Sequence, residues 1–212
     1  MDDTFGFAWA YTDLEIYRVL LNETVLTISM ALGTVILVVL FITVNAQVTF
    51  FVVSVVLLVN VYMTAFGYFW GLTLNNIMAV NMSFSLGIAV DYSVHIAHTY
   101  LFVKPPKSLK KAGQRREYKA RKAISQMGSS VFHGGFSTFL AISVLAFAKV
   151  YTFVVFFKTW FCMIIFGMLN GMVLLPVILS IFGPVDAAVT QESNEEKTAS
   201  QAELKDLELR AI

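Results

Sequence analysis

Three residues that can hold or exchange a proton lie close together in the stretch GIAVDYSVHIAHTY, residues 87–100: Asp91, His95 and His98. Between Glu23 and Lys104, Asp91 is the only formally charged residue. At about 100° per residue, these three side chains share one face of a helix. A carboxylate next to an imidazole can exchange a proton with it near neutral pH. The pattern therefore indicates a site that responds to protons or to another cation.

Two alternatives to a proton-exchanging site stay open. An ionised carboxylate at mid-membrane costs about 2.5–3.5 kcal/mol, so Asp91 should face the protein interior or a water-filled path. A static, hydrogen-bonded lock between helices, formed by Asp91 and His95, is one alternative. Zinc bound by Asp91, His95 and His98, with His133 as the fourth ligand, is another. Nothing else in the sequence indicates a metal enzyme, and no nucleophile–base set is recognisable. We therefore expect no catalytic site, metal or cofactor.

Further polar side chains follow in the segment GSSVFHGGFSTF, residues 128–139. Ser137 and Thr138 should lie near the depth of Asp91, where their hydroxyls can support a relay. Hydrogen bonding to their own helix backbone is the alternative and the usual outcome. His133 should lie nearer the membrane surface, where a simple interfacial role competes with a role in the relay.

The elements that must position these residues are indicated by composition. The chain has 212 residues, 58% of them hydrophobic, and a mean hydropathy of +0.73. Soluble domains have about 45–50% apolar residues, and here the excess lies in long runs. A helix needs about 20 residues to cross the hydrocarbon core. The sequence thus predicts an all-α, multi-pass membrane protein with five spans, at about 24–45, 48–69, 77–102, 128–149 and 154–182.

The segments outside these runs complete the predicted organisation. Residues 1–23 form an extracytoplasmic segment before the transmembrane domain, residues 24–184. Pro105-Pro106 ends the third span, and a basic helix at about 107–126 should lie on the membrane surface. Residues 185–212 form an acidic tail that is either disordered or contains a short helix.

Charge predicts the orientation. Nine of the fifteen basic residues fall between Lys104 and Lys122, and such a loop should be cytoplasmic. Five spans then place the N-terminus outside and the acidic tail in the cytoplasm. The N-terminal flank agrees, with five acids and only Arg18 as a base. It lacks the pattern of a cleavable signal peptide, so we expect the first span to act as its own insertion signal.

Small residues predict how the spans pack. Gly167 and Gly171 form a GxxxG, and small residues recur every four positions from Ser130 to Thr138. Such residues let helices approach closely in lipid. Packing within one bundle is the preferred interpretation, and dimerisation is the alternative. Pro176 should kink the fifth span. The glycines expected to serve packing are Gly87, Gly134, Gly167 and Gly171.

The stretch GLTLNNIMAVNMSFSLGIAVDYSVHIAHTY resembles the tenth transmembrane helix, with its preceding loop, of eukaryotic RND-superfamily proteins of the Patched, Dispatched and Niemann–Pick C1 type. ETVLTISMALGTVILVVLF resembles the eighth helix. GSSVFHGGFSTFLAISVLAFA and FGMLNGMVLLPVILSIFGP are similar to the eleventh and twelfth. The resemblance covers about residues 15–184, and GxxVDYxxHI is its most specific element. Asn170 departs from it, because many patched-like sequences have His there.

The resemblance implies a function and a set of partners. Members of the family have twelve helices in two halves, and this chain resembles helices eight to twelve. It implies a half-transporter that moves a sterol or another lipid in a cation-coupled way, with a first-half chain or another copy as partner. Membrane lipids, and a sterol among them, would then be partners, whereas no nucleic acid is indicated.

The similar Asp-Tyr pair of mycobacterial RND lipid exporters implies that the relay comprises Asp91, Tyr92, His95 and His98. The location would be the plasma membrane or an endomembrane. A non-transporting scaffold subunit and a fragment of a longer patched-like protein are the alternatives.

Overall fold

The computed structural model describes residues 9–73, 75–106, 108–109 and 111–185. Within this part the chain is entirely helical, and five of its helical stretches are long and apolar enough to cross a membrane. This confirms the predicted fold class. The helices are α1 (Trp9–Thr43), α2 (Ala46–Phe69), α3 (Asn76–Phe102), α4 (Ala112–Ser143), α5 (Tyr151–Leu169) and α6 (Leu175–Phe182). A 3₁₀ turn, η1 (Val144–Phe147), follows α4, and a π-helical stretch, η2 (Asn170–Leu174), joins α5 to α6.

Asparagines begin two of the spans. Asn45 follows Val44, which has a left-handed φ of 48°, and its side chain accepts hydrogen bonds from the backbone of Gln47 and Val48 at 3.1 Å. Asn75 accepts from the Met78 backbone at 2.9 Å. Both bonds satisfy backbone N–H groups that the first turn of a helix leaves without partners. Asparagine at these two positions therefore fixes where α2 and α3 start.

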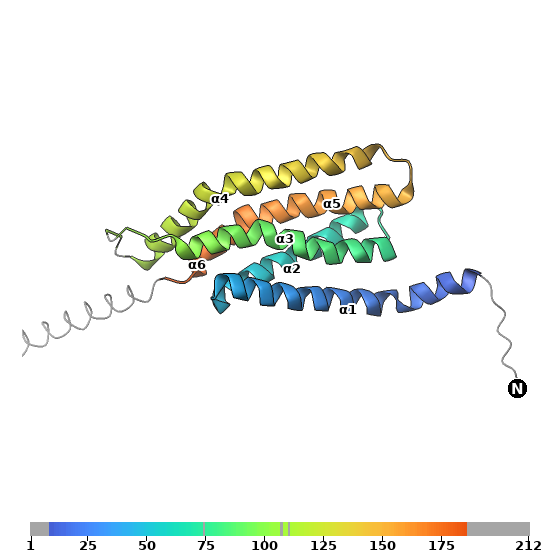
Figure 1. Cartoon of the computed structure of the whole chain (residues 1–212), viewed down its shortest axis with the longest axis horizontal. Helices are drawn as coiled ribbons and strands as arrows, with labels where there is room; N and C mark the ends of the chain where they lie inside the picture. Colours follow the sequence, from blue (N-terminus) through green and yellow to red (C-terminus); the bar gives the residue numbers. More distant parts are fainter. Residues whose placement is uncertain (1–8, 74, 107, 110, 186–212) are drawn as a thin grey trace, which may run out of the picture.

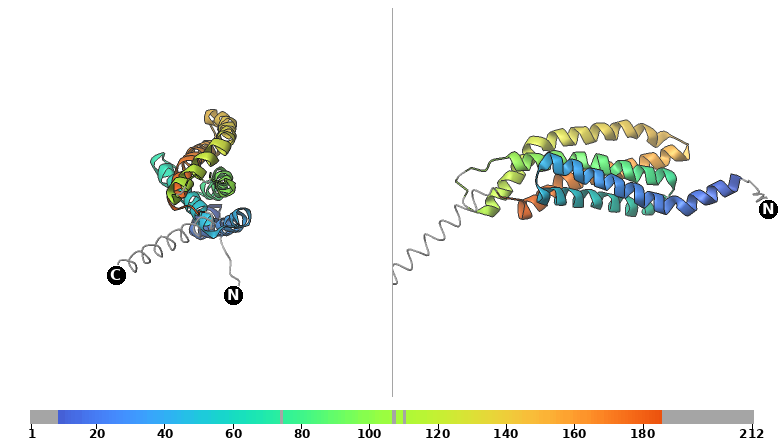
Figure 2. Two further views of the ribbon diagram at one scale, coloured as in Figure 1. Left: turned by 90° about the vertical axis from the view of Figure 1, so that its left-hand side faces the viewer. Right: turned by 60° about the horizontal axis from the view of Figure 1, so that its bottom comes forward.

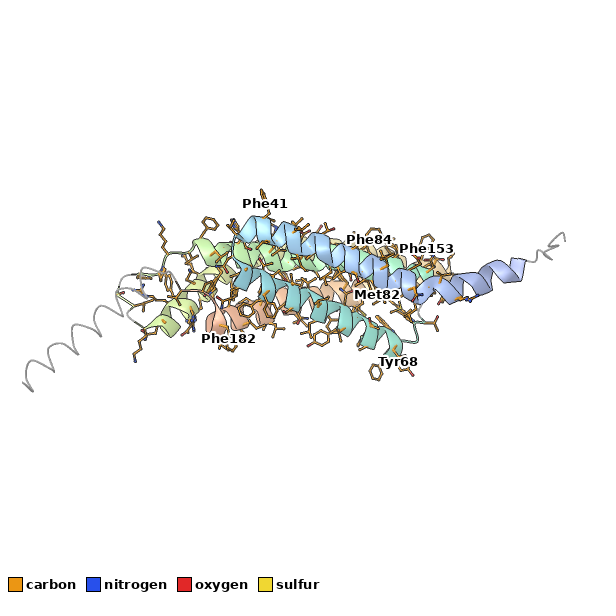
Figure 3. All side chains as sticks on the ribbon, turned by 90° about the horizontal axis from the view of Figure 1, so that it is seen from below. Phe41, Tyr68, Met82, Phe84, Phe153 and Phe182 are labelled. Carbon is orange, nitrogen blue, oxygen red and sulfur yellow. The ribbon has the colours of Figure 1, made fainter. Side chains whose placement is uncertain are left out.

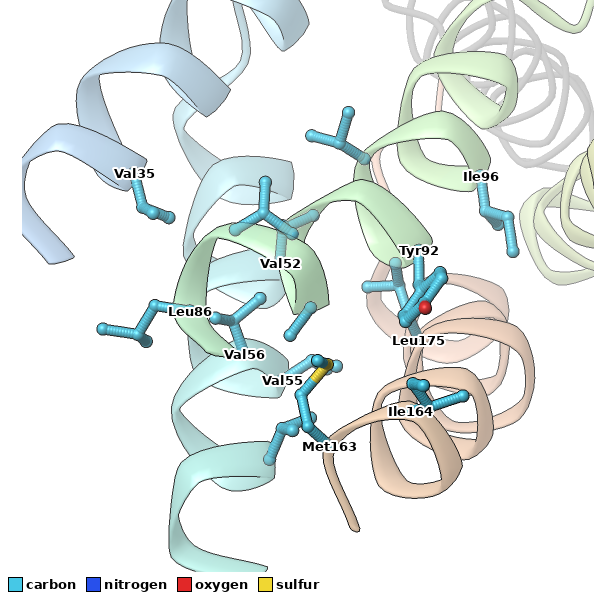
Figure 4. Packing of buried hydrophobic residues seen from close by; sticks show 14 of the residues in the cluster. Val35, Val52, Val55, Val56, Leu86, Tyr92, Ile96, Met163, Ile164 and Leu175 are labelled. Carbon is cyan, nitrogen blue, oxygen red and sulfur yellow. The ribbon is translucent and has the colours of Figure 1, made fainter. Parts of the chain in front are cut away.

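Helix α3 is the centre of the bundle. Figure 1 shows it between α4 and α5 on one side and α1 and α2 on the other, and the end-on view in Figure 2 shows the same grouping. It contacts all five other helices. The hydrophobic core forms where valines of α2 meet Leu86, Tyr92 and Ile96 of α3 and Met163, Ile164 and Leu175 of the fifth span (Figure 4).

The outer helices leave much of their apolar surface uncovered. In the most apolar part of each helix, 61% of the residues of α3 are buried, compared with 11% for α1 and 17% for α4. Phe41 and Tyr68 project away from the bundle and are 86% and 80% exposed (Figure 3). Apolar side chains on the outside are what a helical bundle in lipid requires.

The connections alternate between the two ends of the bundle. The α1–α2 turn, the α3–α4 connection and the end of α6 lie at one end, and the α2–α3 and α4–α5 connections lie at the other (Figure 1). The start of α1 extends beyond the second end. The basic segment is thus at the opposite end from the beginning of α1, because three spans, an odd number, lie between them.

Two helices differ from the prediction. The basic segment is not a helix of its own, because α4 runs without a break from Ala112 to Ser143. No proline interrupts this stretch, and lysine and arginine favour helix. Likewise α1 begins at Trp9 and not near residue 24. A surface location for the basic part stays a prediction. Residues 1–8 and 186–212, and with them nearly all of the acidic tail, lie outside the described residues.

Pro176 changes the helical pattern of the fifth span, as expected of a proline. The pattern is π-helical over Asn170–Leu174, and α-helix resumes at Leu175 with the proline in its first turn. Proline cannot donate a backbone hydrogen bond, so one bond of a regular helix is missing at this position. The wider π-helical turn just before it changes which backbone groups pair.

Candidate functional site

The predicted polar face of α3 is its open face. Gly87, Asp91, His95 and His98 are all exposed, whereas the residues between them are mostly buried. Helices α2 and α5 cover the opposite face of α3. The acid and the imidazoles therefore share one helical face, which is exposed although α4 borders it.

Asp91 lies in a cleft of about 350 Å³ between α3 and α4. Helix α3 contributes Ile88, Asp91, Tyr92 and His95, and α4 contributes Ser130, Val131, Gly134 and Thr138. We refer to this site as the Asp91 cleft. Among the described residues, the Asp91 carboxylate takes part in no hydrogen bond or ion pair. It is accordingly available to a proton, a cation or water.

The hydroxyls of the α4 wall differ in position. Thr138 lines the cleft and donates a hydrogen bond to its own helix at Gly134 O, 3.0 Å away. A threonine hydroxyl bonded in this way can still accept a hydrogen bond. Ser130 lines the cleft as well. Ser137 is exposed elsewhere on α4, outside the residues that line the cleft.

Tyr92 connects the Asp91 cleft to the core. It is only 6% exposed, and its ring is packed against the fifth span. A Cβ atom on Gly167 would lie 2.9 Å from Tyr92 Cδ2, and one on Gly171 would lie 3.0 Å from Tyr92 O. The GxxxG thus allows two helices of the same bundle to meet. The buried Tyr92 hydroxyl forms no hydrogen bond of normal geometry within the described part of the chain, although the Thr138 side chain lies near enough to interact with it.

The other predicted residues lie apart from Asp91. His98 lines a second cleft near the end of α3. His133 is exposed on α4, beside Phe132, and does not line the Asp91 cleft. Apart from the backbone of their own helix, no described atom lies within 4 Å of a Cβ position on Gly87 or Gly134. The glycine of α4 that packs closely is Gly135, where a Cβ would lie 2.5 Å from Met168 Sδ.

A zinc site finds no support in this arrangement. Among the described residues, no three His, Cys, Asp or Glu side chains gather closely enough to hold a metal ion. Asp91 and His95 share a cleft, but His98 and His133 lie outside it.

Polar contacts on the inner face of α3 were not foreseen from the sequence. Asn81 Nδ2 donates to Thr159 Oγ1 at 3.0 Å, and Ser85 Oγ donates to Asn60 Oδ1 at 3.0 Å. All four residues are buried. The asparagines inside otherwise apolar spans could have indicated these contacts, because a polar group in hydrocarbon needs a hydrogen-bond partner. These contacts hold α3 to α2 and α5 and leave its open face unaffected.

Known proteins resemble this chain over most of its length. It is 34% identical over 190 residues to the Niemann-Pick type C1-related protein of Toxoplasma gondii, which covers 89% of this chain. It is 31% identical over 184 residues to NPC intracellular cholesterol transporter 1 of Sus scrofa, covering 85% of the chain. Protein patched homolog 1 of Caenorhabditis elegans is 31% identical over 177 residues, covering 82%.

The matches cover 15%, 14% and 12% of these three relatives, so the chain spans a small part of their length. No family model matches the chain. With five long apolar helices and sequence similarity along most of the chain, the protein is a distant homologue of the Niemann–Pick C1 and patched proteins of the RND family.

Proposed function

We propose that the chain forms the part of an RND carrier that corresponds to helices eight to twelve, and that it contributes to cation-coupled transport of a sterol or another lipid. The observation that carries the proposal is the unpaired Asp91 carboxylate in an open cleft within an apolar span. The name of the Sus scrofa relative, an intracellular cholesterol transporter, supports the substrate class.

Protonation of Asp91 would change whether water or a neighbouring helix can contact the cleft at low cost in free energy. The ionised carboxylate needs water or a cation, because burying its charge in an apolar surface is costly. The protonated form can be covered by a neighbouring helix at a lower cost. A cation gradient would thereby favour one arrangement of the helices on one side of the membrane and another on the opposite side. His95 is in the same cleft and would receive or supply the proton.

A partner chain is part of the proposal. The exposed face of α3 and the uncovered surfaces of α1 and α4 leave Asp91 accessible from outside the bundle. Lipid alone would be a poor neighbour for a carboxylate. A second half of RND type, or another copy of this chain, would close the cleft. A non-transporting scaffold subunit is the second candidate, and the experiment below distinguishes the two.

The test compares Asp91→Asn with wild type in proteoliposomes that hold the assembled complex at matched protein levels. Asparagine is nearly the same size as aspartate and forms hydrogen bonds, but it does not titrate. We expect sterol or lipid transfer in Asp91→Asn to fall to the rate seen without a gradient. Full gradient-driven transfer with an unchanged pH profile would contradict the relay and favour the scaffold.

Two histidine variants sharpen this test. His95→Gln removes the imidazole inside the cleft, so it should shift the pH profile of transfer without abolishing it. His133→Gln removes an imidazole from α4 outside the cleft, so it serves as the matched control and should leave the profile unchanged. Equal shifts in both variants would mean that the position of His95 in the cleft does not matter.

The proposed orientation has its own test. Ser108 lies in the connection after α3, and Trp70 lies at the other end of the bundle. Cysteines introduced at these positions should react with a membrane-impermeant maleimide from opposite sides, with Ser108→Cys labelled only from the cytoplasm. Buried Cys162 provides the background measurement. Labelling of Ser108→Cys from the extracytoplasmic side would overturn the topology.

A further inference from the structure

A second cleft, of about 480 Å³, lies where α3 ends and faces the first half of α4. Its polar lining comes from both helices and the connection between them. We call it the basic cleft and define it by its polar residues His98, Lys104, Tyr118, Lys122 and Gln126. None of the residues that line it is acidic. The basic cleft thus presents two lysines and several hydrogen-bond donors to whatever occupies it.

Three other basic side chains of this region are already used inside the protein. Arg115 donates to Leu109 O, and Arg116 Nη1 donates to Ile181 O at 2.9 Å. Lys119 is buried with its Nζ 5.2 Å from the centre of the Tyr100 ring. By contrast, Lys104 and Lys122 are exposed and form no ion pair or hydrogen bond with any described residue. Both positive charges therefore remain available to a molecule in the cleft.

One wall of the basic cleft is apolar. Phe102 is 70% exposed and Met127 is 36% exposed, and both line the cleft. The ring of His98 lies against that of Phe102, with centroids 4.6 Å apart. The apolar stretch of α3 ends at Phe102, and Lys104 follows within two residues. The cleft therefore lies where the apolar stretch of α3 gives way to basic residues, which is where we expect the boundary between hydrocarbon and headgroups.

We propose that the basic cleft binds an anionic glycerophospholipid of the adjoining leaflet. Lys104 and Lys122 would contact the phosphate and the anionic headgroup, Tyr118 and Gln126 would donate hydrogen bonds, and an acyl chain would lie along Phe102 and Met127. Basic pockets between spans on the cytoplasmic side recognise such headgroups. The choice of leaflet rests on the proposed orientation. The site is separate from the Asp91 cleft, and its test needs no transport.

The experiment uses the full chain in nanodiscs and two photoactivatable lipids with the same acyl chains, a phosphatidylserine and a phosphatidylcholine. Wild type should be labelled preferentially by the phosphatidylserine, within a peptide that contains residues of the basic cleft. Lys104→Gln with Lys122→Gln should weaken this labelling on the order of 20-fold, because each basic side chain near an anionic lipid surface contributes about fivefold. Labelling by phosphatidylcholine should be unchanged.

A charge-matched control separates the cleft from general surface charge. Lys111→Gln with Arg121→Gln removes two exposed positive charges of the same region that do not line the cleft. This control should keep the preference for phosphatidylserine. If the double variant in the cleft fails to fold by size-exclusion chromatography, the single variants Lys104→Gln and Lys122→Gln carry the test, each with about a fivefold loss.

Three outcomes would overturn the proposal. The first is equal labelling of wild type by both lipids. The second is an equal loss in the cleft variant and in the control variant. The third concerns the acidic segment that follows residue 185 in the sequence. If selective labelling appears only in a chain ending at Val185, that segment and not a lipid occupies the cleft of the full chain.

Discussion

Polar side chains on the two faces of α3 differ in whether they have a hydrogen-bond partner on another helix. On the inner face, Asn81 and Ser85 each reach a partner on a neighbouring helix at 3.0 Å. On the open face, the Asp91 carboxylate has no such partner within the described part of the chain, although it lies in the same helix. A paired polar group in a membrane bundle stabilises one arrangement, whereas an unpaired ionisable group there indicates a functional site. The difference separates the residues that hold the bundle together from those available for function.

The largest effect should come from Gly171→Val, which adds a branched side chain where the fifth span packs against the inner side of α3. The new Cβ would lie 3.0 Å from Tyr92 O, a backbone atom that cannot move aside easily. Overpacking of this kind costs about 1–3 kcal/mol of unfolding free energy or more. Thermal unfolding in detergent should show a clear loss. Gly33→Val on α1, where a Cβ meets no described atom within 4 Å, is the matched control and should change little.

An intermediate effect is expected from two neighbouring glycines of α4. In Gly135→Ala the new methyl group would press on Met168 Sδ, at 2.5 Å, and we expect a loss of about 1 kcal/mol because the methionine side chain can adjust. In Gly134→Ala the methyl group enters the open cleft, and alanine favours helix over glycine by about 0.8–1.0 kcal/mol. The same substitution at adjacent positions should thus have opposite signs in thermal unfolding. A matching loss at both positions would mean that Gly134 also packs against a helix.

The smallest effect is expected from Asp91→Asn on stability. Because the carboxylate has no partner among the described residues, the unfolding free energy should change by less than about 0.5 kcal/mol. Asn81→Ala, on the inner face of the same helix, should cost about 0.6 kcal/mol, the average for hydrogen bonds between membrane helices, and at most about 1.7 kcal/mol. If Asp91→Asn proved the more destabilising of the two, Asp91 would be a structural lock and the contrast between the faces would fail.

Hydropathy was sufficient to predict the five helical spans, because crossing a bilayer demands long apolar helices and little else shapes such segments. The spacing of small residues predicted that Gly167 and Gly171 serve packing. The rotation of α4 could not be predicted. Gly134 shares a helical stripe with the small residues Ser130 and Thr138, whereas the adjacent Gly135 shares one with Val131 and Phe139. Only the position of Met168 on the fifth span decides which stripe faces inward.

The candidate site could be predicted only in part. Helical periodicity placed Asp91, His95 and His98 on one face, and they are there. Periodicity says nothing about which neighbouring segment stands opposite each residue. Seven residues of helix separate Asp91 from His98 by about 10 Å along the axis. That distance is enough to put His98 opposite the basic part of α4 and in a different cleft.

The end of α6 has a consequence for how the bundle can move. Its last carbonyls accept hydrogen bonds from three other helices: Ile181 O from Arg116, Phe182 O from Gln47 at 2.7 Å, and Leu179 O from Tyr100 at 3.1 Å. At the opposite end, the Tyr151 hydroxyl has a single polar contact, with Asn75 at 3.3 Å. Toward that end the fifth span is also held, because Lys158 Nζ donates to Trp70 O and Thr159 Oγ1 accepts from Asn81, each at 3.0 Å. We therefore expect this span to tilt as one unit with α3, because hydrogen bonds join the two helices toward both ends.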